Sequence, residues 1–293
     1  MIFNVNGNTL SLDKKGGKYV FISHAHTDHT INTYTERLIT SNETYTLANL
    51  KGNITIPNWV ELYNAGHIIG AKQIAFEVNG KKIVYTGDLR LKKGIFGEYG
   101  EIVETDVLYI DATFGNPIFK FPEPMETYEQ IIKWVKENEN NILVFGAYPI
   151  GKTQELVKML NEYGYIPILQ EQNYNYTERL KKINYKFDML KAGTEESMEV
   201  LRSGGIIISP VKSLKMYIKR WLSRIFKRKV YFTLVTGWKF RNRLIDRIFP
   251  LSDHSDFNDI VKYIEYSNAK KIIPLFGKPD YLKQKFKDKI KIL

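Results

Sequence analysis

The chain has 293 residues, of which 43% are hydrophobic and 26% charged, so it is long enough for one large or two smaller domains and too apolar to be mainly disordered. It contains no cysteine, which excludes disulfides, thiolate metal sites and cysteine nucleophiles and leaves histidine and carboxylate as metal ligands. The formal net charge of +11 favours a polyanionic partner. The sequence has no apolar run of ~18 residues and no signal-peptide layout, which predicts a soluble, cytoplasmic protein without a membrane partner.

Short strand-like runs dominate the first third of the chain, and we expect strands at 19–23, 54–56, 74–78, 82–86 and 107–110. The dipeptide Asn79-Gly80 between two of these runs predicts a hairpin turn. From residue 126 the pattern alternates, with helices expected at 128–136 and 154–160 and strands at 142–145, 165–169 and 206–209. A basic helix follows, and then a helix at 257–266 and a strand at 271–275. The change of pattern predicts two differently built parts, the second inserted into the first.

Positive charge is concentrated in one segment between Lys212 and Arg247, which holds a single acidic residue, Asp246. Apolar residues recur there at helical spacing, so a core-packed helix and a helix on anionic lipid are alternatives to a nucleic-acid surface. We favour nucleic acid because Lys and Arg that neutralise phosphates release counterions. The contacts predicted from this segment are Lys219, Arg220, Arg224, Lys239, Arg241 and Arg243.

Four potential metal ligands occur within six residues in the sequence His24-Ala25-His26-Thr27-Asp28-His29, directly after an expected strand. A turn at a strand end can point such side chains into one pocket without long-range folding to gather them. Imidazole and carboxylate suit zinc, and also manganese or iron. The remaining histidines lie in turn-like or polar settings: His67 in Gly66-His67-Ile68-Ile69-Gly70 and His254 in Ser252-Asp253-His254-Ser255-Asp256.

The motifs HAHTDH, GHIIGA and TGD, in this order and spacing, resemble those of the metallo-β-lactamase superfamily. Further on, IDATFG, GKTQEL, TGWKFRNR and LSDHSDF resemble its β-CASP branch of nucleases, and in particular the ligase-associated DNA exonucleases and archaeal mRNA 3′-end processing factors. The resemblance implies an α/β fold, an αββα sandwich with metals at one sheet edge and an inserted β-CASP α/β domain. It puts the metallo-β-lactamase domain at 1–114 and 237–293 and the insertion at 115–236.

The resemblance also implies roles for individual residues. His24, His26 and His67 would hold one metal ion, Asp28 and His29 a second, and Asp88 would bridge both. Asp13 would support the ligand loop from behind. Asp111 would orient His254, which would protonate the leaving oxygen. The implied catalytic residues are therefore Asp28, Asp88, Asp111 and His254, and the implied cofactor is one or two Zn²⁺, with Mn²⁺ as an alternative and no small-molecule cofactor.

One position departs from the family pattern. RNA-cleaving members usually carry a further ligand of the second metal in a V-H-G context, and Leu275-Phe276-Gly277 stands there in this chain. Phenylalanine cannot bind metal, so the second site is expected to be weak or empty. Because many DNA-cleaving members also lack this histidine, DNA is favoured over RNA as the substrate.

The residues from Gly146 to Thr153 satisfy the P-loop expression between a strand and a helix. Bulky Tyr148 and Ile150, and Pro149 without an N–H, argue against nucleotide binding there. A milder expectation remains, in which Lys152 and the helix start contact one phosphate of the nucleic acid.

The sequence thus predicts a metal-dependent nuclease, with hydroxide generated near Asp88 attacking the phosphodiester in line and DNA processing or repair as its role. The nearest alternative is an RNA-processing ribonuclease with the same site. A small-molecule hydrolase of the glyoxalase or lactonase kind would need neither the long insertion nor the basic segment. A silent binding protein would not need the full set of ligands up to Asp88.

Overall fold

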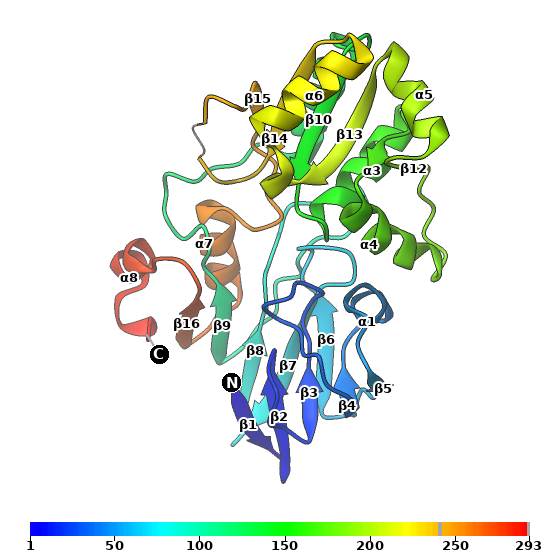
Figure 1. The fold of residues 1–293 in the computed structure, drawn as a ribbon. Coiled ribbons are helices and arrows are strands. Elements are labelled where there is room, and N and C mark those ends of the chain that lie inside the picture. The colour runs from blue at the N-terminus through cyan, green and yellow to red at the C-terminus, as the bar shows by residue number, and fades with distance from the viewer. Residues whose placement is uncertain (240–241, 292–293) are drawn as a thin grey trace. The chain divides into compact units, whose positions relative to one another are not determined.

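The computed structural model describes residues 1–239 and 242–291 and divides into two compact units (Figure 1). Unit 1 comprises Met1–Lys120 and Asp253–Leu293, and unit 2 comprises Phe121–Ser252. These borders differ from the predicted domain borders at 114/115 and 236/237. Residues after 236 stay with unit 2 because strand β15 (Arg247–Phe249) pairs in parallel with β14 (Val230–Val235).

Unit 1 contains two five-stranded sheets. The first has the order β1-β2-β3-β4-β5 and consists of β1 (Ile2–Val5), β2 (Asn8–Leu12), β3 (Tyr19–Phe21), β4 (Thr35–Ile39) and β5 (Gly52–Ile54). The second has the order β16-β9-β8-β7-β6 and consists of β6 (Val60–Asn64), β7 (Lys72–Val78), β8 (Lys81–Tyr85), β9 (Val107–Asp111) and β16 (Lys271–Leu275).

Alternation along the strands explains why these sheets pack face to face. On β7, Ile74 and Phe76 join the core between the two sheets, whereas Ala75 belongs to the core on the opposite face. On β8, Tyr85 and Val84 divide in the same way. A strand that buries both of its faces must be covered on both sides, because successive side chains point in opposite directions.

Helices supply the two outer layers of unit 1. Helix α7 (Phe257–Tyr266) packs its buried Ile260, Tyr263 and Ile264 on the outer face of the second sheet, and α8 (Asp280–Phe286) joins the same core through Leu282. Helix α1 (Asn42–Ala48) lies against the first sheet, where Tyr45 and Ala48 contact the cluster around Ile22 and Leu38. A 3₁₀ turn, η2 (Lys287–Lys289), follows α8. The layers therefore form the expected αββα sandwich.

Unit 2 is a parallel sheet with the strand order β12-β11-β13-β10-β14-β15. Its remaining strands are β10 (Ile142–Ala147), β11 (Ile168–Leu169), β12 (Leu190–Lys191) and β13 (Gly205–Pro210). Its helices are α2 (Pro124–Lys136), α3 (Lys152–Glu162), α4 (Glu171–Lys181), α5 (Glu195–Ser203) and α6 (Met216–Phe226), with a 3₁₀ turn η1 (Val211–Ser213). Leu201 of α5 and Leu222 and Phe226 of α6 share one core cluster with the central strands.

Most predicted elements occur within a few residues of their expected bounds. The predicted hairpin is confirmed: β7 and β8 pair antiparallel across Asn79 and Gly80, whose φ angles of +51° and +70° are those of a type I′ turn. The predicted strand at 165–169 is much shorter, and the strand expected at 54–56 ends at Ile54. In the part of the chain that the structure describes, no helix is long and apolar enough to cross a bilayer.

Candidate metal centre

Strand topology brings the predicted ligands to one edge of the second sheet. Strands β6, β8 and β9 run in the same direction, because β7 is antiparallel to both β6 and β8 while β9 is parallel to β8. Their carboxyl ends therefore meet at one edge. His67 follows β6, Asp88 follows β8, and Asp111 is the last residue of β9. From the facing sheet, the turn after β3 contributes His24, His26, Asp28 and His29.

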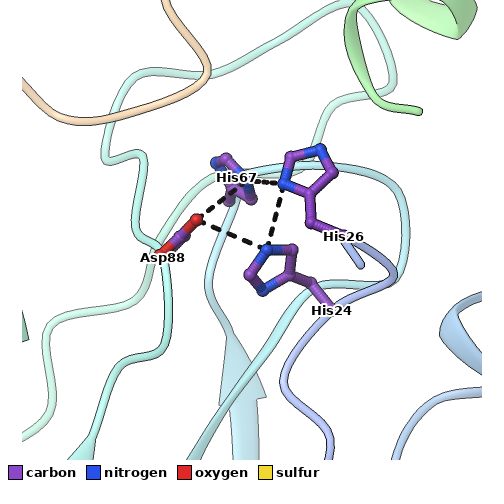
Figure 2. A group of neighbouring side chains, drawn as sticks. All are labelled: His24, His26, His67 and Asp88. Carbon is purple, nitrogen blue, oxygen red and sulfur yellow. Dashed lines mark hydrogen bonds and ion pairs between the residues drawn. The ribbon is translucent and has the colours of Figure 1, made fainter. Parts of the chain in front are cut away.

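Four of these side chains converge on one point (Figure 2). His26 Nδ1 lies 3.1 Å from His24 Nε2 and 3.2 Å from His67 Nε2. Asp88 Oδ2 lies 3.3 Å from His24 Nε2 and 3.5 Å from His67 Nε2. A tetrahedral zinc site with arms of 2.0–2.1 Å has ligand-to-ligand edges of roughly 3.3–3.4 Å. The donor set and its spacing therefore fit a divalent metal ion.

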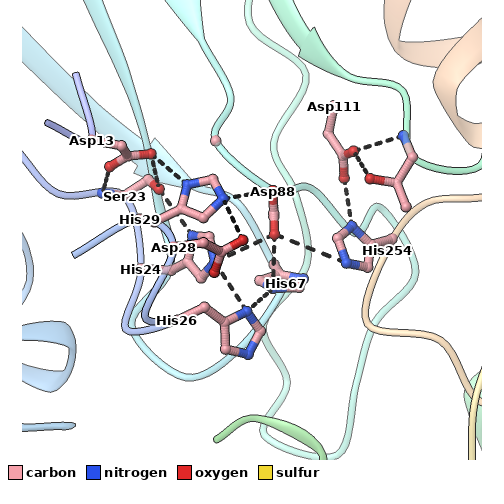
Figure 3. A network of polar contacts seen from close by, with 12 residues as sticks. Asp13, Ser23, His24, His26, Asp28, His29, His67, Asp88, Asp111 and His254 are labelled. Atoms are coloured by element: carbon pink, nitrogen blue, oxygen red, sulfur yellow. Dashed lines mark hydrogen bonds and ion pairs between the residues drawn. The ribbon is translucent and has the colours of Figure 1, made fainter. Parts of the chain in front are cut away.

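Asp88 faces a second group with its other oxygen (Figure 3). Its Oδ1 lies 3.6 Å from His29 Nε2, which is 3.8 Å from Asp28 Oδ2. Burial disfavours the charge on Asp88, but the charge interaction and hydrogen bond of His24, together with the charge of His254, outweigh it and hold the pKa of Asp88 well below its usual range. A carboxylate with one oxygen toward each group fits the expected bridging role. The side chain of Asp28 is 79% exposed, so it lies at the open side of this second group.

A chain of hydrogen bonds behind the ligands fixes their orientation. Asp13 Oδ2 accepts from His29 Nδ1 and from the Ser23 hydroxyl, each at 2.7 Å. The Ser23 oxygen in turn accepts from His24 Nδ1 at 2.9 Å, which turns Nε2 of His24 toward the cluster. Burial lowers the pKa of His29, but its hydrogen bond and charge interaction with Asp13 outweigh burial, and the pKa rises to about 9.

His67 is oriented from a different segment. Its Nδ1 donates to the backbone carbonyl of Asp253 at 2.8 Å, which leaves Nε2 directed at Asp88. Burial is the main cause that lowers the pKa of His67 well below its usual value. A neutral imidazole with a free Nε2 is the form that binds metal. Gly66 beside it has φ +69°, and a side chain there would come within 2.3 Å of the Arg90 carbonyl oxygen, so only glycine fits this close approach.

His254 and Asp111 form the predicted pair beside Asp88. His254 Nδ1 donates to Asp111 Oδ2 at 2.7 Å, and its Nε2 lies 3.9 Å from Asp88 Oδ2. Asp111 is itself held by the backbone N–H groups of Leu89 and Thr113. Burial disfavours the imidazolium, yet the charge and hydrogen bond of Asp111 outweigh it and raise the pKa of His254 to about 9. The pair therefore presents a protonated Nε2 toward Asp88 near neutral pH.

Phe276 stands beside the second group, as the sequence comparison with the family pattern suggested. Its ring meets the ring of His29 edge-on, with 5.4 Å between the centroids, and it is 49% exposed. The second group therefore has a hydrophobic ring where a further ligand would complete it.

The predicted nucleic-acid contacts differ in their exposure. Arg220, Arg224, Lys239 and Arg243 are exposed, whereas Arg241 lies outside the described residues. Lys219 is only partly exposed, because its Nζ lies 2.6 Å from Asp246.

Lys152 requires a correction. Its side chain is 2% exposed, and its Nζ is 3.1 Å from Glu155 Oε2 in a buried ion pair, so it is not presented to a phosphate. The Gly151 N–H, which a P-loop would offer to phosphate, donates to Gln154 Oε1 at 2.7 Å. The P-loop alternative therefore fails, because both its lysine and this N–H group are already bonded within the chain.

Sequence reasoning missed the supporting residues Ser23, Tyr85 and Thr113. Tyr85 donates to Asp13 Oδ2 at 2.7 Å, and the Thr113 hydroxyl donates to Asp111 Oδ1 at 2.7 Å. Ser23 and Thr113 each lie within two residues of a predicted site residue, which is the one available signal. Nothing in the sequence connects Tyr85 with Asp13, because their contact forms only when the two sheets pack.

Comparisons with known proteins agree with this architecture. No sequence profile of a known family matches the chain. The chain is 28% identical over 283 residues to a probable DNA ligase from Opitutus terrae, covering 89% of this chain and 27% of that protein. It is 33% identical over 137 residues to an RNase J-like protein from Methanocaldococcus jannaschii, covering 45% of this chain and 29% of that protein.

Two further comparisons cover a larger share of the similar protein. The chain is 25% identical over 289 residues to the 5′ exonuclease Apollo from Gallus gallus, covering 89% of this chain and 59% of that protein. A crystal structure of a protein of unknown function from Enterococcus faecalis V583 has the same fold, with a TM-score of 0.62 at 15% identity over 94% of this chain and 78% of that chain. The chain spans less than two thirds of each of the three named relatives. With the two-sheet sandwich and its histidine-rich edge, the chain resembles the β-CASP branch of the metallo-β-lactamase superfamily, to which these relatives belong.

Proposed function

We propose that this protein is a metal-dependent nuclease that hydrolyses phosphodiester bonds, with DNA as its favoured substrate, and that unit 2 is its β-CASP domain. One observation carries the proposal: Asp88 lies between the three clustered histidines and the His254–Asp111 pair, with its Oδ2 3.3 Å from His24 Nε2 and 3.9 Å from His254 Nε2. This arrangement supports a metal site and a proton donor around one position. Zn²⁺ is the proposed ion because three imidazoles and one carboxylate match its preferred ligands and spacing, and Mn²⁺ is the alternative.

When bound, a divalent ion supplies a Lewis acid for a phosphoryl oxygen and lowers the pKa of water toward ~7. The residues of the chain prepare the site for this chemistry. His24 and His67 offer ring nitrogens whose directions are set from behind, so two of the three histidines of the ligand cluster are preorganised. Asp88 remains ionised and contributes a fixed negative charge between the two groups.

His254 is the proposed general acid. A leaving alkoxide needs a proton, and a donor with a pKa of about 9 still carries its proton near neutral pH. Asp111 holds Nδ1, so the proton available to substrate is the one on Nε2, on the side of Asp88. Asp111 thus positions His254 and does not itself contact the reacting atoms.

The choice of DNA over RNA rests on two supports. Two of the relatives reported above are a probable DNA ligase and a 5′ exonuclease, and Phe276 occupies the position where RNA-cleaving members usually carry a ligand. The RNase J-like relative supports RNA as the second candidate. Cleavage of matched single-stranded DNA and RNA oligonucleotides with Zn²⁺ or Mn²⁺ separates the two, since faster cleavage of RNA would reverse the preference.

The nuclease proposal is tested by His26→Ala. His26 Nδ1 is central to the cluster, because it is within 3.2 Å of the ligand nitrogens of both His24 and His67. We expect cleavage to fall to the level of protein treated with chelator, while circular dichroism stays unchanged. Glu36→Ala, at a 73% exposed side chain outside the site, should keep full activity. Nuclease activity in folded His26→Ala would refute the proposed site.

A further inference from the structure

Helix α6 carries two apolar rows, of which the core uses only one. Ile218, Leu222 and Phe226 follow one another at intervals of four residues and pack in the core cluster of unit 2. Residues four apart lie on one face of a helix. This row is sufficient to dock α6 on its sheet.

The second row lies in solvent. Tyr217 is 69% exposed, Trp221 51% and Ile225 47%, and these three are also spaced four residues apart. Both rows recur at helical spacing, so the sequence pattern alone does not separate Trp221 and Ile225 from the core residues of this helix. Two aromatic residues and an isoleucine exposed in one row on a helix indicate a binding surface, because a monomer gains no stability from leaving them in water.

Positive charge flanks the exposed row. Arg220 and Arg224 are three residues after Tyr217 and Trp221, so each lies beside one aromatic ring on the helix surface. Among the residues that the structure describes, neither arginine forms an ion pair with a carboxylate, whereas Lys219 on the other side of the helix is paired with Asp246. We name the surface formed by Tyr217, Arg220, Trp221, Arg224 and Ile225 the α6 face.

The charge of the α6 face decides between possible occupants. In a two-fold dimer the same patch would meet itself, so Arg220 and Arg224 would face their own copies. An anionic lipid surface would suit the charge, but an interfacial helix sinks a broad apolar face into the bilayer. On the α6 face, Arg220 and Arg224 flank the exposed row on one side, and the apolar row on its other side is buried in the core, so no broad apolar face is left for a bilayer.

We infer that the α6 face binds single-stranded nucleic acid, with bases stacked on Tyr217 and Trp221 and phosphates neutralised by Arg220 and Arg224. Aromatic rings combined with unpaired arginines are the means by which proteins hold single strands without reading sequence. The inference deepens the proposed nuclease function, since it gives unit 2 a surface that holds the strand being processed.

The test measures binding in the absence of metal, so it does not depend on cleavage. The affinity of chelator-treated protein for a fluorescein-labelled 20-nucleotide oligo-dT is followed by anisotropy. Tyr217→Ala and Trp221→Ala should each weaken binding about tenfold, as expected for the loss of one stacked base, and Trp221→Phe should retain most of it. Replacing Arg220 and Arg224 with Gln should reduce the slope of log K against log [salt] by roughly 1.4.

Tyr266→Ala is the matched control, because Tyr266 on α7 is 66% exposed, much like Tyr217. It should leave the oligonucleotide affinity unchanged. The inference is overturned if the folded Tyr217→Ala/Trp221→Ala double variant binds oligo-dT as tightly as the parent protein.

It is equally overturned if that double variant keeps its oligonucleotide affinity but loses binding to phosphatidylserine vesicles, or loses a dimer seen in sedimentation. Those results would assign the α6 face to lipid or to a second copy. Failure of the nuclease proposal gives a different result. The protein would then bind the oligonucleotide through the α6 face but would not cleave it, whichever metal ion is added.

Discussion

At the scale of single residues, protonation separates the two candidate metal-binding groups, the first formed by His24, His26, His67 and Asp88 and the second by Asp28, His29 and Asp88. His67 is neutral at pH 7 because its pKa is well below the usual value, whereas His29, with a pKa of about 9, carries a proton on the nitrogen that would bind metal. Asp13 causes this difference. Its carboxylate accepts a hydrogen bond directly from His29, whereas it is connected to the first group only through the Ser23 hydroxyl. The first group is therefore ready for an ion at pH 7 and the second is not.

Occupancy of the second group should therefore depend on pH. A ligating imidazole must lose its proton, so the affinity of the second group should fall about tenfold for each pH unit below 9. At a fixed, low concentration of free Zn²⁺, bound metal should rise from one ion per chain near pH 7 toward two near pH 9. Elemental analysis after dialysis against metal buffers measures this.

Asp13→Asn supplies the control for this behaviour. Removing the carboxylate lowers the pKa of His29, so the rise in stoichiometry should move to lower pH. A stoichiometry that is the same from pH 7 to 9 in the parent protein would contradict the assignment.

At the scale of elements, the sandwich presents its site through strand ends and a helix start. Asp256 is the N-cap of α7, and its Oδ1 accepts from the N–H groups of Asn258 at 2.9 Å and Asp259 at 3.1 Å. The same segment carries His254 two residues earlier and the Asp253 carbonyl that orients His67. Starting this helix at the correct residue therefore also sets the position of two site histidines.

Removal of this cap should cost stability. Asp256→Ala should lower the free energy of unfolding by about 1 kcal/mol, since a lost N-cap leaves helix N–H groups without an acceptor. Urea denaturation followed by circular dichroism measures the change. Glu265→Ala, at a 49% exposed side chain near the other end of α7, should change stability by less than about 0.5 kcal/mol. Equal effects of the two substitutions would contradict the role of the cap.

At the scale of the molecule, the site connects segments that are far apart in the sequence. The turn after β3, the turn after β6, the end of β8 and the segment before α7 all contribute to it. A metal ion bound by three of these segments would link them only in the folded state. Binding to the native state alone stabilises it by mass action.

Metal removal should therefore lower the melting temperature. At a metal concentration 100 times the Kd, the gain is about 2.7 kcal/mol, which for a chain of this size corresponds to roughly 5–10 °C. Scanning calorimetry of metal-loaded protein with and without chelator measures the shift. His26→Ala should melt at the same temperature in both conditions. A chelator effect that persists in this variant would place the ion elsewhere.

The sequence by itself determined the ligand loop, because His24 to His29 are neighbours in the chain and a turn after a strand suffices to gather them. It also determined the hairpin at Asn79-Gly80, since turn chemistry is local. Packing decided the contacts between distant residues, which are the hydrogen bond from Tyr85 to Asp13 and that from His67 to the Asp253 carbonyl. It also decided that Lys152 is buried in an ion pair with Glu155. Packing likewise decided which of the apolar rows of α6 enters the core, because helical spacing places residues on a face but does not tell which face meets the sheet.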